Sequence, residues 1–243
     1  MHVKKAFRLS LVGGIVAVAV AANAAPIVQW NFNSVPPDGN TGTGTTVPNI
    51  NLTGSASISL LGGVTNPGFN SGVGSSDPAA SDNSGYQTTT YAAQGTENGL
   101  RGVAFFGSTL GYQDIVVNFD LRHSNTSSRF AQLEYTLDGG STWTFGGLFE
   151  ADLGGDKWYN VRTVDLTSVA GANNNPLFGF KVVAVFAPGT GGYLPSTPTS
   201  TYGPNGTWRF DMVTINGNLI PEPGTIAALA VGVVGLMARR RRK

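Results

Sequence analysis

The chain has 243 residues, of which 41% are hydrophobic and 12% are charged, and it contains no cysteine. The lack of cysteine excludes disulfides, thiolate catalysis and cysteine-ligated metals. The formal net charge of +1 comes from basic residues near the two ends, because residues 25–220 hold seven basic and thirteen acidic side chains, a net charge of about −6. This acidic balance argues against nucleic acid as a partner, since no basic patch remains to hold a phosphate backbone.

The first residues have the pattern of a secretory signal peptide. Three basic side chains within the first eight residues precede an apolar run over residues 9–22, and Ala22 and Ala24 form a small-x-small cleavage site. We predict a helical signal peptide over residues 1–24, recognised by the export machinery and cut by signal peptidase, and a mature chain that begins near Ala25. A retained anchor is the alternative, and the small residues directly after the apolar run count against it.

Residues 25–218 are predicted to contain strands and no long helix. Gly, Ser, Thr and Asn are abundant, and the clearest segments alternate between apolar and polar residues, as residues 112–122 and 130–138 do. Residues 62–99 are predicted to be mostly surface loop around one short strand. In chain order, the expected strands cover residues 27–32, 50–60, 86–91, 100–106, 112–122, 130–138, 142–149, 158–166, 177–187 and 207–216.

Short strands at this spacing predict an all-β fold, an antiparallel β-sandwich of the jelly-roll type that forms one extracytoplasmic domain over residues 25–218. No repeat of 20–50 residues recurs in the sequence, which argues against propellers and solenoids. An exported chain of this size without disulfides must be held together by its core, and a large sandwich meets that need.

Residues 136–143, Thr-Leu-Asp-Gly-Gly-Ser-Thr-Trp, resemble the Asp-box motif, Ser/Thr-x-Asp-x-Gly-x-Thr-Trp, of sialidases and other secreted β-proteins. We expect Asp138 to accept hydrogen bonds from turn amides, Gly140 to take a positive φ and Trp143 to pack on the hairpin. The resemblance implies that Asp138, Gly140, Thr142 and Trp143 form a structural turn. A sialidase would carry several copies and an arginine cluster, whereas this chain has one copy.

The inventory of catalytic side chains is poor, and we expect no catalytic residue. His123 is the one histidine after the signal peptide, it is expected to be exposed in a loop, and no Gly-x-Ser-x-Gly elbow accompanies it. If the first and last strands of the domain lie side by side, the Asp211 carboxylate can form a polar site with Asn31 or Asn33, but no spacing in the sequence requires this arrangement.

Glu150, Asp152 and Asp156 lie close together in the sequence, with two glycines between the last two. Carboxylates that converge on a flexible loop are the ligands that Ca²⁺ prefers, so calcium is the one cofactor considered. The Asp-x-Asp-x-Asp-Gly spacing is missing, so a solvated acidic turn is favoured over a calcium site. A pair of glycosidase carboxylates is a third interpretation.

Aromatic residues suggest two places for a binding surface. All four tryptophans lie in expected strands, where packing in the core is the default. The loop of residues 189–206, with Tyr193 and Tyr202, is a better place for a polar binding surface than the tryptophans are, but a disordered connecting loop is the favoured interpretation there.

Residues 219–243 contain three features in a fixed order. Pro221, Glu222 and Pro223 form a tripeptide that is unsuited to a helix interior and stays open to an enzyme. Residues 225–238 carry no charge and reach roughly 21 Å as a helix, against a hydrocarbon core of ~30 Å. A basic anchor then holds the end on the cytoplasmic side; it contains Arg239, Arg240, Arg241 and Arg242.

This order resembles the PEP-CTERM sorting signal of bacterial surface proteins. The resemblance implies a single transmembrane helix before processing, cleavage by an exosortase near the tripeptide, and release to the cell surface or extracellular matrix. An uncut tail anchor is the alternative.

The opening strand of the domain, which contains Trp30-Asn31-Phe32, the hairpin at Asp138 and the closing strand from Trp208 to Val213 resemble the jelly-roll domains of PEP-CTERM proteins and, more weakly, concanavalin-like and carbohydrate-binding sandwiches. We therefore expect a noncatalytic structural or adhesive protein associated with the exopolysaccharide of a biofilm. A carbohydrate-binding module, with or without calcium, and a secreted hydrolase are the alternatives.

Overall fold

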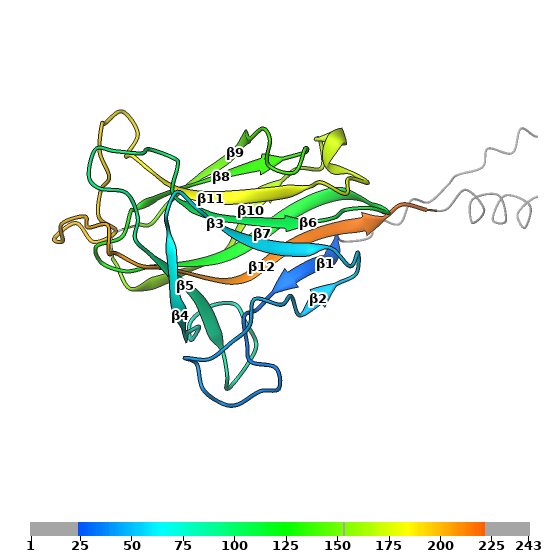
Figure 1. Cartoon of the computed structure of the whole chain (residues 1–243), viewed down its shortest axis with the longest axis horizontal. Helices are drawn as coiled ribbons and strands as arrows, with labels where there is room; N and C mark the ends of the chain where they lie inside the picture. The colour runs from blue at the N-terminus through cyan, green and yellow to red at the C-terminus, as the bar shows by residue number, and fades with distance from the viewer. Residues whose placement is uncertain (1–23, 153, 222–243) are drawn as a thin grey trace, which may run out of the picture.

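The computed structural model describes residues 24–152 and 154–221, and the regular secondary structure in this part is almost wholly β-strand (Figure 1). The one helical element in this part is a 3₁₀ turn at Ala170–Ala172, and no helix there is long and apolar enough to cross a membrane. The predicted signal helix and the predicted transmembrane helix lie outside the described residues. In chain order the strands are β1 (Ala25–Trp30), β2 (Ile50–Asn51), β3 (Ala56–Leu61), β4 (Thr65–Ser71), β5 (Ser84–Thr89), β6 (Gly102–Gly107), β7 (Tyr112–His123), β8 (Phe130–Thr136), β9 (Thr144–Glu150), β10 (Lys157–Asp165), β11 (Gly179–Val185) and β12 (Trp208–Leu219).

Sheet A is organised around β12, which pairs with β7 along one side. On the other side, the first residues of β12 pair with β5 and the later ones pair with β1. A register shift between Asp211 and Thr214, where Met212 has a φ of +46°, separates these two partners. The remaining strands extend the edges, with β10 beyond β7, β2 beyond β1 and β4 beyond β5.

Sheet B has the order β3-β6-β11-β8-β9, and every neighbouring pair is antiparallel. Apolar side chains at alternate positions of both sheets meet in one core. The ring of Phe105 on sheet B connects the two layers, because its centroid lies 5.6 Å from Trp30 and 5.6 Å from Phe210 of sheet A, and 5.3 Å from Phe180 of its own sheet. The prediction of an all-β fold with two antiparallel sheets is confirmed.

The first third of the chain differs from the sequence prediction. Residues 50–60 form two strands because Gly54, with a φ of +76°, turns the chain between β2 and β3. Residues 62–99 contain two strands, and β4 was not expected because its Asn66-Pro67-Gly68 segment breaks the apolar alternation; a register shift against β5 accommodates it. The connections before β2 and between β4 and β5 extend below the sandwich in Figure 1.

Candidate functional site

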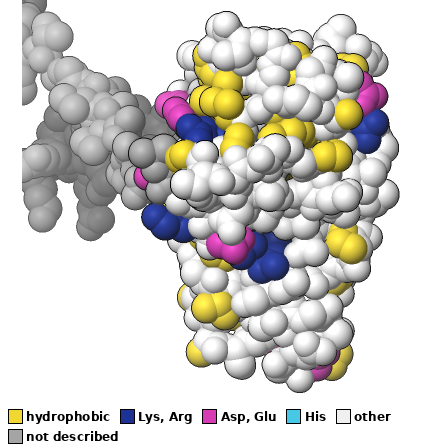
Figure 2. Space-filling model, turned by 90° about the vertical axis from the view of Figure 1, so that its left-hand side faces the viewer, with side chains coloured by type: hydrophobic (Ala, Val, Ile, Leu, Met, Phe, Trp, Pro, Cys, Tyr) yellow, Lys and Arg dark blue, Asp and Glu magenta, His cyan; other side chains and the backbone are white. Residues whose placement is uncertain are grey.

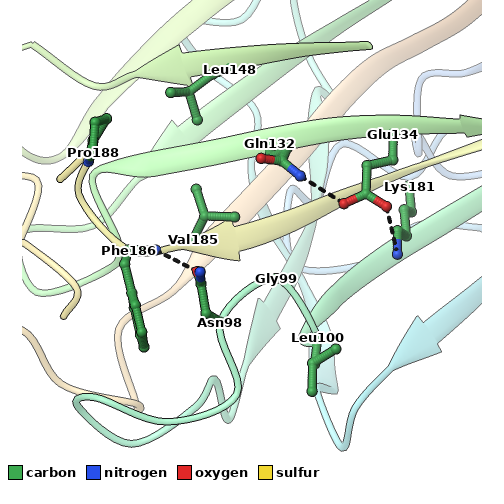
Figure 3. A pocket seen from close by; sticks show the side chains of 10 residues that line it. All are labelled: Asn98, Gly99, Leu100, Gln132, Glu134, Leu148, Lys181, Val185, Phe186 and Pro188. Atoms are coloured by element: carbon green, nitrogen blue, oxygen red, sulfur yellow. Dashed lines mark hydrogen bonds and ion pairs between the residues drawn. The ribbon is translucent and has the colours of Figure 1, made fainter. Parts of the chain in front are cut away.

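A groove of about 480 Å³ lies on the outer face of sheet B (Figure 3). Its floor is made by side chains of β8 and β11, and its sides by Leu148 of β9, by the loop that precedes β6 and by the residues that follow β11. Ten residues line it: Asn98, Gly99, Leu100, Gln132, Glu134, Leu148, Lys181, Val185, Phe186 and Pro188.

The pleat of the sheet explains why polar side chains meet here. Residues 130–136 alternate between the core and the outer face, so the inward Leu133 lies between the outward Gln132 and Glu134. In the register of sheet B, Lys181 lies opposite both Glu134 and Ala104. Ala104 has only a methyl group, so no long side chain stands beside Lys181 on that side.

Three polar side chains form a connected network on the groove floor (Figure 3). Gln132 Nε2 donates to Glu134 Oε1 at 2.7 Å, and Lys181 Nζ lies 2.9 Å from Glu134 Oε2. The Lys181 ammonium also lies 4.7 Å from the ring centroid of Trp143. The lysine and glutamate side chains are 13% and 16% exposed, so they are held in place and still reachable from the groove.

The walls of the groove are mainly apolar. Leu100 and Leu148 are exposed, and Phe186 is held by its main-chain N–H, which donates to Asn98 Oδ1 at 2.7 Å. This bond fixes the loop before β6 against the end of β11. Apolar walls around a few fixed donors and acceptors are the usual make-up of a small-molecule or saccharide site.

The Asp138 turn joins β8 to β9 at one end of this face. Asp138 Oδ1 accepts from the Thr142 N–H at 2.9 Å and from the Thr136 hydroxyl at 2.7 Å, and Asp138 Oδ2 accepts from the Thr142 hydroxyl at 2.6 Å. The Thr142 and Thr136 hydrogen bonds lower the pKa of Asp138 to about 2. Gly140 has a φ of +96°, and the centroid of the Trp143 ring lies 6.2 Å from that of Phe106. Both carboxylate oxygens of Asp138 accept hydrogen bonds within the turn.

The acids that the sequence suggested for calcium do not converge. Glu150 Oε1 lies 3.9 Å from an Arg129 nitrogen, Asp152 Oδ1 accepts from the Tyr159 hydroxyl at 2.6 Å, and Asp156 pairs with Arg122 at 2.8 Å. Each carboxylate therefore has a different partner. No group of three acidic, histidine or cysteine side chains able to hold a metal exists in residues 24–152 and 154–221.

The expectation of an exposed His123 is wrong, because this side chain is fully buried at the end of β7. Its Nδ1 lies 2.8 Å from the Ser128 carbonyl and its Nε2 lies 3.2 Å from an Arg162 nitrogen. A carbonyl only accepts and a guanidinium only donates, so Nδ1 carries the proton. Burial and the charge of Arg162 both lower the pKa of His123 well below its usual value. The alternation of β7 continues inward from Leu121 to His123, which is the signal that sequence reasoning missed.

The structure does not support a binding surface built on the two tyrosines of residues 189–206. Tyr193 and Tyr202 stack on one another with centroids 4.7 Å apart and are both buried, so neither offers a free ring to a ligand. Trp30 and Trp208 lie in the core as expected. Figure 2 shows the face of the molecule at the left-hand side of Figure 1. The few basic and acidic side chains on this face are interspersed and form no basic patch.

A family model for the PEP-CTERM protein-sorting motif matches residues 219–242. The chain carries a PEP-CTERM sorting motif. The match spans Pro221, Glu222 and Pro223 and the arginines at 239–242, and it implies an exported surface protein with an exosortase as its processing partner. Of these residues the structure describes Pro221 alone, two residues after β12 ends; the rest lie outside the described part.

No curated protein matches this chain. Among solved structures it is similar to the N-terminal CBM22-1-CBM22-2 tandem domain of Xyn10C from Paenibacillus barcinonensis, with 13% sequence identity and a TM-score of 0.48. The similarity covers 86% of this chain and 53% of that one, so this chain spans about half the length of the tandem domain. At this level of similarity no property of that protein passes to this chain.

Proposed function

We propose that this PEP-CTERM protein has a noncatalytic, structural or adhesive role at the cell surface or in the exopolysaccharide matrix. The sorting motif at residues 219–242 supports the destination. The burial of His123, which is bonded to Ser128 and Arg162, supports a role without catalysis. In this proposal a membrane helix holds the protein until exosortase cuts it, and the exported domain is a jelly-roll-like sandwich.

We further propose that the groove on sheet B binds saccharide units of the matrix, which favours the carbohydrate-binding alternative. The observation that carries this proposal is the row of Gln132, Glu134 and Lys181 between apolar walls. Sugar hydroxyls both donate and accept hydrogen bonds, and the row offers an amide, a carboxylate and an ammonium at fixed positions. The C–H faces of a sugar ring can pack on Leu148 and Phe186.

The test measures binding of the full chain, in detergent micelles, to exopolysaccharide of its own host. The double variant Gln132→Ala/Leu148→Ala removes one polar and one apolar contact from the groove, and we expect binding to weaken about tenfold or more, as loss of about 1.4 kcal/mol would produce. The matched control is Gln29→Ala/Leu52→Ala, which changes the same residue types on β1 and just after β2. Equal binding by both double variants and the unaltered chain contradicts a saccharide site in this groove.

The sorting proposal has its own test. Replacing Pro221 and Pro223 by alanine should leave a longer species, because the extended tripeptide that the exosortase reads is lost. Intact-mass measurement of the envelope fraction reports the C-terminus directly, and Pro78→Ala, in the loop between β4 and β5, is the control. A processed C-terminus that is the same with and without these two prolines contradicts recognition of the tripeptide.

A further inference from the structure

Two carboxylates face each other on the outer face of sheet A. Asp211 of β12 and Asp120 of β7 are directly paired in the register, so their side chains project from the same face of the sheet. Both lie on the side away from the core, yet they are 0% and 1% exposed. The cover is the connection between β4 and β5, residues 72–83, whose Ser76 N–H donates to Asp120 Oδ2.

Neither of these acids has a basic partner. Among the described residues the ion pairs involve four other carboxylates, and none includes Asp77, Asp120 or Asp211. Asp120 is compensated by main-chain donors, since its Oδ1 also accepts from the Val161 N–H at 2.6 Å. Asp211 Oδ1 accepts from the Met212 N–H at 2.7 Å. Its Oδ2 has no partner in hydrogen-bonding geometry, although the Ser75 hydroxyl is near enough to oppose the rise in the pKa of Asp211. A buried carboxylate that lacks a partner is costly, so either a cation beside it or a proton on it is expected.

A second unpaired oxygen lies at the same place. Asn83 is buried, its Oδ1 has no donor, and its Nδ2 points toward Ser75 Oγ at 3.4 Å. A Cβ on Gly72 would clash with Asn83 Oδ1 and lie 2.9 Å from Asp211 Oδ2, so both oxygens flank the space beside this glycine. Two acceptor oxygens that approach one point repel each other unless a cation or a proton lies between them.

We propose that Asp211 and Asn83 are ligands of a Ca²⁺ ion that fastens the 72–83 connection to sheet A. Carboxylate, amide and main-chain oxygens are the ligands of a hard cation, and neither histidine nor cysteine is present to favour a transition metal. Asp77 and Asp120 also lie near Asp211, but their carboxylate oxygens already accept hydrogen bonds. The ion takes its remaining oxygens from the main chain and from water. It lies on the opposite sheet from the saccharide groove and does not depend on the proposed function.

The connection itself gives a reason for such an ion. It is polar, and it is tied to the rest of the molecule by hydrogen bonds such as Asn160 Nδ2 to the Gly74 carbonyl, 2.9 Å, and Asn33 Nδ2 to Asp77 Oδ2, 2.8 Å. Trp158 of β10 packs on it, because a Cβ on Gly74 would lie 2.9 Å from Trp158 Cδ1. This indole can report on an ion bound below the connection.

The experiment uses the full chain in detergent micelles, stripped with EDTA and then titrated with CaCl₂ or MgCl₂. We expect a Kd on the order of 10⁻⁴–10⁻³ M for Ca²⁺, as in other extracellular modules, with weaker binding of Mg²⁺. At Ca²⁺ a hundredfold above Kd, Tm should rise by roughly 5–10 °C. Tb³⁺, used as a probe in place of Ca²⁺, should emit on excitation of tryptophan and lose that emission when Ca²⁺ is added.

Asp211→Asn keeps the shape of the side chain and removes its charge, so the Tm response and the Tb³⁺ emission should both be lost. Asp152→Asn, an exposed acid in the loop that the sequence suggested for calcium, is the matched control and should keep both. Should Asp211→Asn fail to fold, the response of the unaltered chain still decides the matter. No Tm rise with Ca²⁺, or the same rise in Asp211→Asn, overturns the proposal and leaves Asp211 held by a proton or by the amide of Asn83.

Discussion

The outer faces of the two sheets differ in what covers them. On sheet B the outward polar residues, Gln132, Glu134 and Lys181, lie in an open groove. On sheet A the outward acids Asp120 and Asp211 lie beneath a connection from a distant part of the chain. The same strand alternation produced both rows, so the difference comes from the loops.

Two acids show what this difference does to the chemistry. The solvent-facing carboxylate of Asp138 is bonded to Thr142 and Thr136, and these bonds lower its pKa to about 2. Burial raises the pKa of Asp211 to about 8, with a smaller contribution from the charges of Asp77 and Asp120. The two acids differ because Asp138 lies in an exposed turn, whereas Asp211 lies on a strand beneath a covering connection.

The largest expected effect is in the core that both faces share. Phe105→Ala should lower the free energy of unfolding by about 3–5 kcal/mol, because Phe105 packs on Trp30, Phe180 and Phe210 and its loss leaves a cavity between the sheets. Chemical denaturation measures this change. Phe145→Ala, at an outer position that is 60% exposed, should cost much less; equal costs would mean that the two sheets are not coupled through Phe105.

A smaller effect is expected from closing the space under the sheet A cover. Gly72→Ala should destabilise the protein by about 1–3 kcal/mol, because the new methyl group would collide with Asn83 and crowd Asp211, both of which are buried. Gly191→Ala is the control, since a Cβ there meets no atom within 4 Å. If both variants have the stability of the unaltered chain, the cover does not pack as closely on Asp211 as described.

Next comes the pH dependence due to His123, which lies on the core side of sheet A. Its folded pKa is depressed, so below the unfolded value of about 6.5 the unfolded chain takes up a proton that the folded chain does not. Stability should therefore fall as the pH falls from 6.5, by at most about 1.4 kcal/mol per pH unit. His123→Gln should remove this part of the slope in denaturation curves at pH 5–7, and an unchanged slope contradicts the assignment.

The smallest effect is expected on the open face. A double-mutant cycle with Lys181→Met and Glu134→Gln should give a coupling of about 0.2–1 kcal/mol, because water in the groove screens the pair. A coupling of several kcal/mol would show that the groove excludes water, and the contrast between the two faces would then be wrong.

Much of this molecule follows from local patterns in the sequence. The alternation of Ile115, Val117, Phe119 and Leu121 predicts β7 and its inward face, and the spacing within residues 136–143 predicts a hydrogen-bonded hairpin turn. The sorting motif is likewise read from contiguous residues. These features depend on neighbours within one strand or turn, so the local sequence is sufficient.

Other features required the tertiary structure. Tyr193 and Tyr202 are buried because they stack on each other and Phe186 packs edge-to-face against Tyr193, contacts that no local periodicity predicts. The acids from Glu150 to Asp156, for which calcium was the less favoured interpretation, do not converge because each has another partner.

Asp211 shows most clearly what the local sequence cannot determine. Its position on an alternating strand indicates an outward side chain, and that is where the structure has it. What buries it is a segment about 130 residues earlier in the chain, which crosses the outer face of sheet A. Strand periodicity is a property of a few consecutive residues, whereas the cover over a sheet depends on how distant loops pack, and only the folded chain decides that.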